Sequence, residues 1–166
     1  RIHQTGVNTM NKVSQSFEGV NRFAGILLHP SSMPGSGPIG TLGEAAFRFV
    51  DFLAQSGCGI WQVLPLGPTG ETHSPYAAFS STAGNTQLVD AELLVEDGLI
   101  DPRIRIDGKS ESRVDFDKAA SQTRTYIGAA AEKLVSGHLL HTDFQVFSAA
   151  QAAWLDDFAL FMALKD

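Results

Sequence analysis

The sequence has little cysteine, no excess of positive charge and no long hydrophobic run. Its single cysteine, Cys58, cannot form a disulfide within the chain or a cysteine-based zinc site. The 12 Lys and Arg residues are outnumbered by 18 Asp and Glu residues, and the net charge of −6 disfavours nucleic acid and anionic membranes as partners. No apolar stretch approaches the length of a membrane helix or a secretory signal core. These absences favour a globular cytoplasmic protein with a neutral ligand.

Several cofactor and catalytic motifs are also missing. The chain has no P-loop, no dinucleotide-binding glycine pattern, no zinc-protease HExxH motif and no nucleophile-elbow serine. His138 and His141 lie three residues apart and indicate a turn between helices rather than a metal site. Cys58 has no neighbouring base and is interpreted as a buried packing residue. We therefore expect neither a metal nor a cofactor.

Carboxylates are numerous, but none is predicted to be catalytic. Retaining glycoside chemistry needs a nucleophile and a proton donor about 5 to 5.5 Å apart. Side chains one or two positions apart on a helix do not face each other, and the candidate pairs lie in polar, apparently solvated segments. These pairs are therefore interpreted as surface charge; they are Asp115 with Asp117, Asp156 with Asp157, and Glu96 with Asp97.

The first ordered part of the chain reads as strand, helix and strand. Residues 23–29 and 60–66 are short apolar runs bounded by turn residues, which predicts buried strands. Between them, Thr41 and Glu44 form a capping-box pattern that predicts a helix start, and Gly57 is a suitable stop. The apolar spacing predicts one buried helix face, made by Leu42, Ala45, Ala46, Phe49, Val50 and Leu53. This order predicts a βαβ unit with parallel strands.

Parallel strands of such a unit place the loops that follow them on the same side of the sheet. We therefore expect the loops at residues 30–40 and 67–85 to converge, as ligand-binding loops do in α/β proteins. The second loop holds Tyr76, whose ring could stack on a sugar while its hydroxyl donates a hydrogen bond. A loop tyrosine is more often a packing residue, so the residue pattern alone leaves both roles open.

Beyond the second loop the chain is predicted to be mainly helical. Residues 88–90 are a candidate extended piece, and 91–97 a short helix closed by Gly98. A helix is predicted over 119–135, and another with Asp143 as its N-cap. The last helix carries an apolar stripe that is interpreted as core, formed by Phe144, Phe147, Ala150, Trp154, Phe158 and Phe161.

Two sequence blocks resemble the amylomaltases, the disproportionating 4-α-glucanotransferases. The resemblance covers residues 23–166 and continues more loosely beyond the second block to the helix at 154–165. The blocks are Ala24-Gly25-Ile26-Leu27-Leu28-His29-Pro30-Ser31-Ser32-Met33-Pro34-Gly35 with Ile39-Gly40-Thr41-Leu42-Gly43, and Trp61-Gln62-Val63-Leu64-Pro65-Leu66-Gly67-Pro68-Thr69-Gly70 with Ser74-Pro75-Tyr76 and Ala83-Gly84-Asn85.

The resemblance implies an α/β fold, the N-terminal portion of a (β/α)₈ TIM barrel with an inserted helical subdomain that begins at about residue 91. It also implies transglycosylation of α-1,4-glucans and maltooligosaccharides through a retaining double displacement. The family's catalytic carboxylates lie downstream of the matched region, and a barrel takes about 250 residues. We therefore expect a fragment, residues 23–166, that stops before barrel closure and is inactive alone. Residues 1–22 are expected to be a disordered or vector-derived extension, with a possible start at Met10.

The same resemblance implies a substrate-binding role for three residues. Tyr76 corresponds to the tyrosine that packs against the sugar at the cleavage point, Ser74 shapes the loop and contacts sugar, and Asn85 holds the loop conformation. The chain departs from relatives at three nearby positions: Glu71 (often aromatic), His73 (often acidic) and Ala77 (Gln in some relatives). The loss of the aromatic residue at Glu71 weakens the case for an accessory glucan site on this loop.

Two alternative functions remain at this stage. An α-amylase-type hydrolase shares the retaining mechanism but transfers the glycosyl group to water, and downstream loops would discriminate it. A non-catalytic sugar-binding module needs only the converging loops. The module is disfavoured because two parallel strands would leave an unpaired apolar edge.

Overall fold

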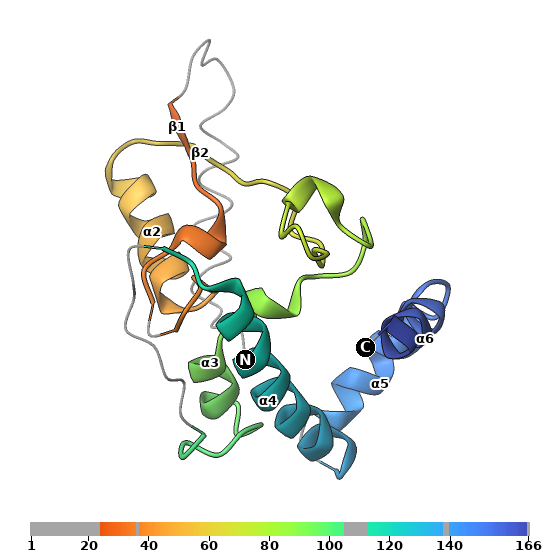
Figure 1. Ribbon diagram of the computed structural model, residues 1–166. Coiled ribbons are helices and arrows are strands. Elements are labelled where there is room, and N and C mark those ends of the chain that lie inside the picture. Colours follow the sequence, from red (N-terminus) through yellow and green to blue (C-terminus); the bar gives the residue numbers. More distant parts are fainter. Residues whose placement is uncertain (1–23, 36, 105–112, 138–139, 166) are drawn as a thin grey trace.

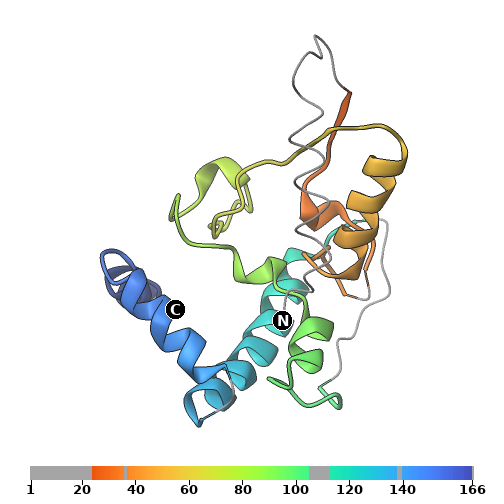
Figure 2. The same ribbon diagram turned by 180° about the vertical axis from the view of Figure 1, so that it is seen from behind.

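The computed structural model describes residues 24–35, 37–104, 113–137 and 140–165. The N-terminal extension predicted for residues 1–22 and His138 lie outside this part of the chain. A βαβ unit lies at one end of the molecule and helices α5 (His141–Ala150) and α6 (Leu155–Lys165) at the other, with α3 (Ala91–Glu96) and α4 (Phe116–Val135) between them (Figures 1 and 2).

The predicted βαβ unit is confirmed. Strands β1 (Gly25–Leu27) and β2 (Ile60–Gln62) are parallel, with helix α2 (Glu44–Gln55) between them in sequence. Both strands are shorter than predicted, and neither is buried among the described residues, since Leu27 and Ile60 are exposed. β1 leads within three residues into Pro30, which has no N–H for a sheet. The Trp61 indole donates to the Leu28 carbonyl at 2.7 Å and extends the contact between the strands.

The start of α2 differs from the capping-box prediction. Gly43 is the N-cap and provides no side-chain hydrogen bond, while the Thr41 hydroxyl donates to the Asp90 carboxylate. A Cβ at Gly43 would lie 2.1 Å from that carboxylate, so glycine is required there. The tertiary contact with Asp90 therefore replaces the local cap. Gly57 has φ 71° and ends the helix region as predicted.

The predicted buried face of α2 is only partly correct. Ala46 and Leu53 are buried, but Leu42 and Val50 are exposed. Phe49 is half-buried and packs edge to face on Trp61, with ring centroids 5.2 Å apart. The two strands β1 and β2 cover less of α2 than its apolar sequence pattern predicts. Cys58, predicted to be buried, is likewise only partly buried.

The clearest core lies between α3 (Ala91–Glu96) and α4 (Phe116–Val135). The short helix α3 is confirmed, and Gly98 has the expected positive φ of 71°. The predicted extended piece at 88–90 overlaps a 3₁₀ turn, η3 (Thr86–Leu88), before the chain extends. The core residues are Ala91, Leu99, Ile100, Tyr126 and Ala130.

The C-terminal apolar stripe belongs to two helices rather than one. They are α5 (His141–Ala150) and α6 (Leu155–Lys165), and Asp143 lies in the first turn of α5 instead of capping it. The stripe is not a core within the described residues, because Phe144, Phe147 and Phe161 are 40%, 50% and 47% exposed. Among the described helices, none has the length and apolarity needed to cross a membrane.

Candidate functional site

The two predicted loops converge on one cavity of about 190 Å³. The loop after β1 and the loop after β2 both line it, together with η3 and the first residue of α4, so the convergence expected from a parallel βαβ unit is confirmed. The lining combines polar and apolar side chains, with no Asp, Glu, Lys or Arg, and comprises His29, Ser31, Ser32, Ile39, Leu64, Pro65, Thr69, His73, Pro75, Asn85, Gln87, Leu88 and Phe116.

The loop after β1 is folded tightly on itself. It begins with a 3₁₀ turn, η1 (Pro30–Ser32), and returns so that Gly40 donates its N–H to the Ser31 carbonyl at 3.0 Å. A Cβ at Gly40 would lie 2.2 Å from the Pro30 carbonyl oxygen, so only glycine permits this close return. This backbone packing holds His29 and Ser31 at the cavity.

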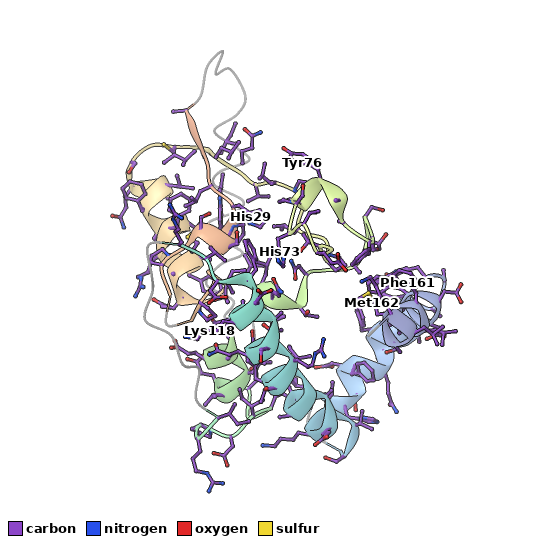
Figure 3. All side chains as sticks on the ribbon, in the orientation of Figure 1. His29, His73, Tyr76, Lys118, Phe161 and Met162 are labelled. Carbon is purple, nitrogen blue, oxygen red and sulfur yellow. The ribbon has the colours of Figure 1, made fainter. Side chains whose placement is uncertain are left out.

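Tyr76 lies on a 3₁₀ turn, η2 (Pro75–Ala77), within the second loop. An antiparallel bridge between Thr69 and Ala78 closes the base of this loop. The Tyr76 side chain is 77% exposed, so it is not a packing residue in this structure. Figure 3 shows Tyr76 at the outer end of the loop and His73 nearer to His29. The exposed ring directly follows Pro75, which lines the cavity, and is free to stack on a sugar; its binding role stays a prediction.

Ser74 and Asn85 stand at the two ends of the Tyr76 region. Ser74 is half-buried, and its carbonyl accepts the Ala77 N–H at 3.0 Å. The Asn85 side chain caps η3 by accepting the Gln87 N–H at 2.9 Å, and its own N–H donates to the Leu66 carbonyl at 2.9 Å. Asn85 thus holds the end of the loop while its side chain lines the cavity. The sugar-binding role of both residues stays a prediction.

Two rings, each three residues from Tyr76, tie its loop to the helices. His73 stacks on Phe116 at the start of α4, with ring centroids 4.3 Å apart and an interplanar angle of 6°. Phe79 meets Phe161 of α6 edge to face at 6.0 Å, and the Lys165 ammonium lies 4.7 Å from the Phe79 centroid. Figure 3 shows Phe161 on the side of α6 toward this loop. Sequence reasoning missed these anchors, because their partners are distant in the chain.

His29 and Gln87 are further cavity residues that the sequence prediction did not single out. The His29 Nδ1 atom accepts the Ser31 N–H at 3.3 Å and lies 2.7 Å from the Ser31 hydroxyl oxygen. Its Nε2 atom and the Gln87 Oε1 atom are buried without a hydrogen-bond partner in the described part of the chain. A histidine at the end of the apolar run that forms β1 was the available signal for this position.

The carboxylate pairs considered in the sequence lie on the surface of the described residues. Asp115 caps α4 by accepting the Lys118 N–H at 2.9 Å, and the predicted surface pairs are exposed, as expected. Across residues 24–35, 37–104, 113–137 and 140–165, no group of three or more His, Cys, Asp or Glu side chains is arranged to hold a metal ion. The three described groups with a shifted pKa lie outside the cavity: the hydrogen bond between Arg103 and Asp101 lowers the pKa of Asp101 and raises that of Arg103, and burial raises the pKa of Tyr126.

Known proteins are similar to this chain in both sequence and fold. The family described as 4-alpha-glucanotransferase matches residues 28–166. The 4-alpha-glucanotransferase of Synechocystis is 42% identical over 149 residues, which cover 87% of this chain and 30% of that protein. The chloroplastic/amyloplastic 4-alpha-glucanotransferase of Arabidopsis thaliana is 41% identical over 156 residues, which cover 87% of this chain and 26% of that protein.

A solved structure is similar over the same region. The amylomaltase from Streptococcus agalactiae in complex with acarbose aligns with a TM-score of 0.78 at 35% identity, covering 87% of this chain and 30% of that one. This chain thus spans less than a third of the length of the relatives it matches. The family match extends through both cavity loops and all of the described helices. The chain belongs to the 4-alpha-glucanotransferase family.

Proposed function

We propose that the complete protein containing this chain transfers glucan segments between α-1,4-glucans by a retaining double displacement. The observation that carries the proposal is the family match over residues 28–166, which includes the loop that presents Tyr76 beside the cavity. In this reaction an enzyme carboxylate would hold the glycosyl group covalently until the 4-hydroxyl of a second sugar accepts it. A neutral cavity lining fits an uncharged substrate.

This chain would supply the N-terminal portion of a (β/α)₈ barrel, from residue 23 to residue 166, with a helical insertion from about residue 91. The parallel β1–α2–β2 unit supports this placement, because it is the repeating unit of such a barrel. The loops after β1 and β2 would form one wall of the active site at the C-terminal ends of the strands. The catalytic carboxylates would come from other parts of the protein, so the chain alone is proposed to be inactive.

Within that wall, Tyr76 would stack on the sugar at the cleavage point, and Ser74 and Asn85 would hold and contact the bound chain. The exposure of the Tyr76 ring and the hydrogen bonds of Asn85 support these roles. Maltooligosaccharides are the proposed ligands, since a related amylomaltase has been solved with acarbose. A cytoplasmic location remains part of the proposal, although three plant relatives are described as chloroplastic/amyloplastic.

The products formed from maltotriose test the proposed transfer. The complete protein is expected to release glucose and to form maltodextrins longer than maltotriose, because the enzyme-bound glycosyl group passes to another sugar. Chromatography of the products over time would show both. Glucose and maltose without longer products would instead identify a hydrolase and contradict the proposal.

A further inference from the structure

A short segment at residues 88–90 joins η3, which lines the cavity, to α3. Its backbone is extended after Leu88 and has no strand beside it in the described part of the chain, so its carbonyl groups need partners from elsewhere. The residues just before α2 supply two contacts. The Leu42 N–H donates to the Leu88 carbonyl at 2.9 Å, and the Thr41 hydroxyl donates to the Asp90 carboxylate. The βαβ unit thus holds this segment through both backbone and side chain.

A second element, helix α4, holds the same segment. The Tyr126 hydroxyl donates to the Val89 carbonyl at 3.1 Å. Because the phenol has one hydrogen and the carbonyl can only accept, the Thr123 hydroxyl, 3.0 Å from the Tyr126 oxygen, must be the donor of the second bond. Tyr126 and Thr123 are each only 5% exposed, and burial raises the pKa of the Tyr126 phenol, so this donor keeps its hydrogen. Tyr126 thus binds Val89 with its own hydroxyl fixed by Thr123.

The held segment leads directly into the cavity wall. Leu88 is the last residue of η3 and is 3% exposed. Its N–H donates to the Asn85 carbonyl at 3.0 Å, while the Asn85 side chain accepts the Gln87 N–H at 2.9 Å. All three residues line the cavity. A displacement of residues 88–90 is therefore transmitted within one turn to Asn85.

We propose that Tyr126 and Thr41 are positioning residues for the bound glucan, because they hold residues 88–90 and thereby keep Asn85 in place in the cavity wall. This inference rests on the proposed function, in which Asn85 contacts the substrate. Neither Tyr126 nor Thr41 lines the cavity, so both act through η3. Tyr126 belongs to the proposed helical insertion and Thr41 to the βαβ unit. The contact between these two parts of the fold thus shapes the substrate site.

Substitutions that each remove one hydroxyl test this inference in the complete protein. Tyr126→Phe keeps the buried ring but leaves the Val89 carbonyl without its donor, and Thr41→Val keeps the shape but cannot donate to Asp90. Thr41→Ser restores a hydroxyl at that position. Leu134→Ala is the control, because Leu134 packs against the same core about two turns beyond Tyr126 and its truncation lowers stability.

Amide hydrogen exchange and acarbose binding provide two independent measurements. Exchange at the Gln87 and Leu88 amides should be faster in Tyr126→Phe and in Thr41→Val, because η3 loosens when the segment after it is released. The same two variants should raise the Kd for acarbose roughly 2- to 5-fold, measured by calorimetry. Thr41→Ser should return both quantities toward those of the unchanged protein. Leu134→Ala should lower the melting temperature and change neither quantity.

A double-variant cycle shows whether the effect passes through Asn85. Asn85→Ala removes the side chain that is proposed to contact the sugar. In that background, Tyr126→Phe should raise the Kd little further, although it should still lower the melting temperature. If Tyr126→Phe instead raises the Kd by the same factor with and without the Asn85 side chain, Tyr126 acts by another route and the inference is overturned.

The remaining outcomes separate this inference from the function on which it rests. If the unchanged protein elongates maltotriose and binds acarbose, but Tyr126→Phe and Thr41→Val only lower the melting temperature, both residues are merely structural and the inference is wrong. An equal rise of the Kd in Leu134→Ala would assign the effect to general instability and would also refute it. If the unchanged protein does not elongate maltotriose, the proposed function is wrong, while faster exchange at Gln87 and Leu88 in Tyr126→Phe would still support the positioning of η3.

Discussion

Tyr76 shows how little of a residue's role is decided by its immediate neighbours in sequence. Pro75 fixes the start of the turn, and the ring that follows stays 77% exposed. An exposed aromatic ring has no packing energy to lose within the described residues, so its removal costs little stability. A ring in that position is available to a ligand, and its substitution can therefore test binding without the ambiguity of unfolding.

At this position we predict a loss of transfer without a loss of stability. In the complete protein, Tyr76→Ala should lower kcat/KM for maltotriose about 10-fold or more, because stacking and a hydrogen bond are both lost. Tyr76→Phe keeps the ring but loses the hydroxyl, so its kcat/KM should lie between the values for the unchanged protein and for Tyr76→Ala. The melting temperature should change little. Initial rates and thermal unfolding check this, with Phe47→Ala, at another exposed aromatic residue on α2, as the control. Normal kinetics for Tyr76→Ala would remove the residue from the site.

At the scale of elements, the loop that carries Tyr76 is held by helices that follow it in the chain. His73 and Phe79 lie three residues on either side of Tyr76 and pack against α4 and α6. His73 also has φ 53°, a left-handed conformation that is uncommon for a residue other than glycine. The His73 stack on Phe116 provides the packing that holds this conformation. The helices α4 and α6 thus position the loop on both sides of its tip.

We predict that loosening either anchor impairs substrate positioning. Phe79→Leu removes the ring that meets Phe161 and Lys165, and His73→Asn tolerates the positive φ but removes the stack. Each should lower kcat/KM for maltotriose several-fold, with Phe79→Tyr restoring most of it. Steady-state rates for the complete protein measure this, with Phe147→Leu as the control. Equal losses in Phe79→Leu and Phe79→Tyr would argue against a positioning role for the ring.

At the scale of the whole molecule, much apolar surface has no cover within the described residues. Val146 and Phe147 on α5 are 65% and 50% exposed, and Leu160 and Leu164 on α6 are 60% and 79% exposed. A soluble monomer seldom exposes a large contiguous apolar patch. The parallel pair β1 and β2 likewise has no further strand beside it among the described elements. Unpaired strand edges and exposed apolar side chains both promote association.

For the 166-residue chain produced by itself, we therefore predict self-association and no transfer activity. Light scattering after size exclusion should show species larger than the monomer. Exchanging Val146 and Leu164 for glutamate should shift the chain toward smaller species, because charge opposes burial of these positions. A matched exchange at Gln145, a polar residue of α5, should not. A monodisperse monomer of the unchanged chain would contradict this prediction.

Local patterns were sufficient for the fold elements near the site. The apolar runs predict both strands, and the spacing between them predicts a parallel βαβ unit, because these signals depend only on neighbouring residues and chain length. The same reasoning brings the two loops together. The glycine stops at Gly57 and Gly98 also follow from local conformation, since both have a positive φ of 71°.

Tertiary contacts decided what local patterns could not. The sequence by itself determined the βαβ unit and the converging loops, whereas the exposure of Tyr76 was decided by the tertiary structure. The helix α2 starts later than predicted, because the Thr41 hydroxyl donates to Asp90, a residue 49 positions away, instead of capping the helix. The buried His29 and Gln87 atoms and the ring contacts at His73 and Phe79 all involve more than one element of the fold. Such contacts form between residues far apart in the chain, and no periodicity within one segment encodes them.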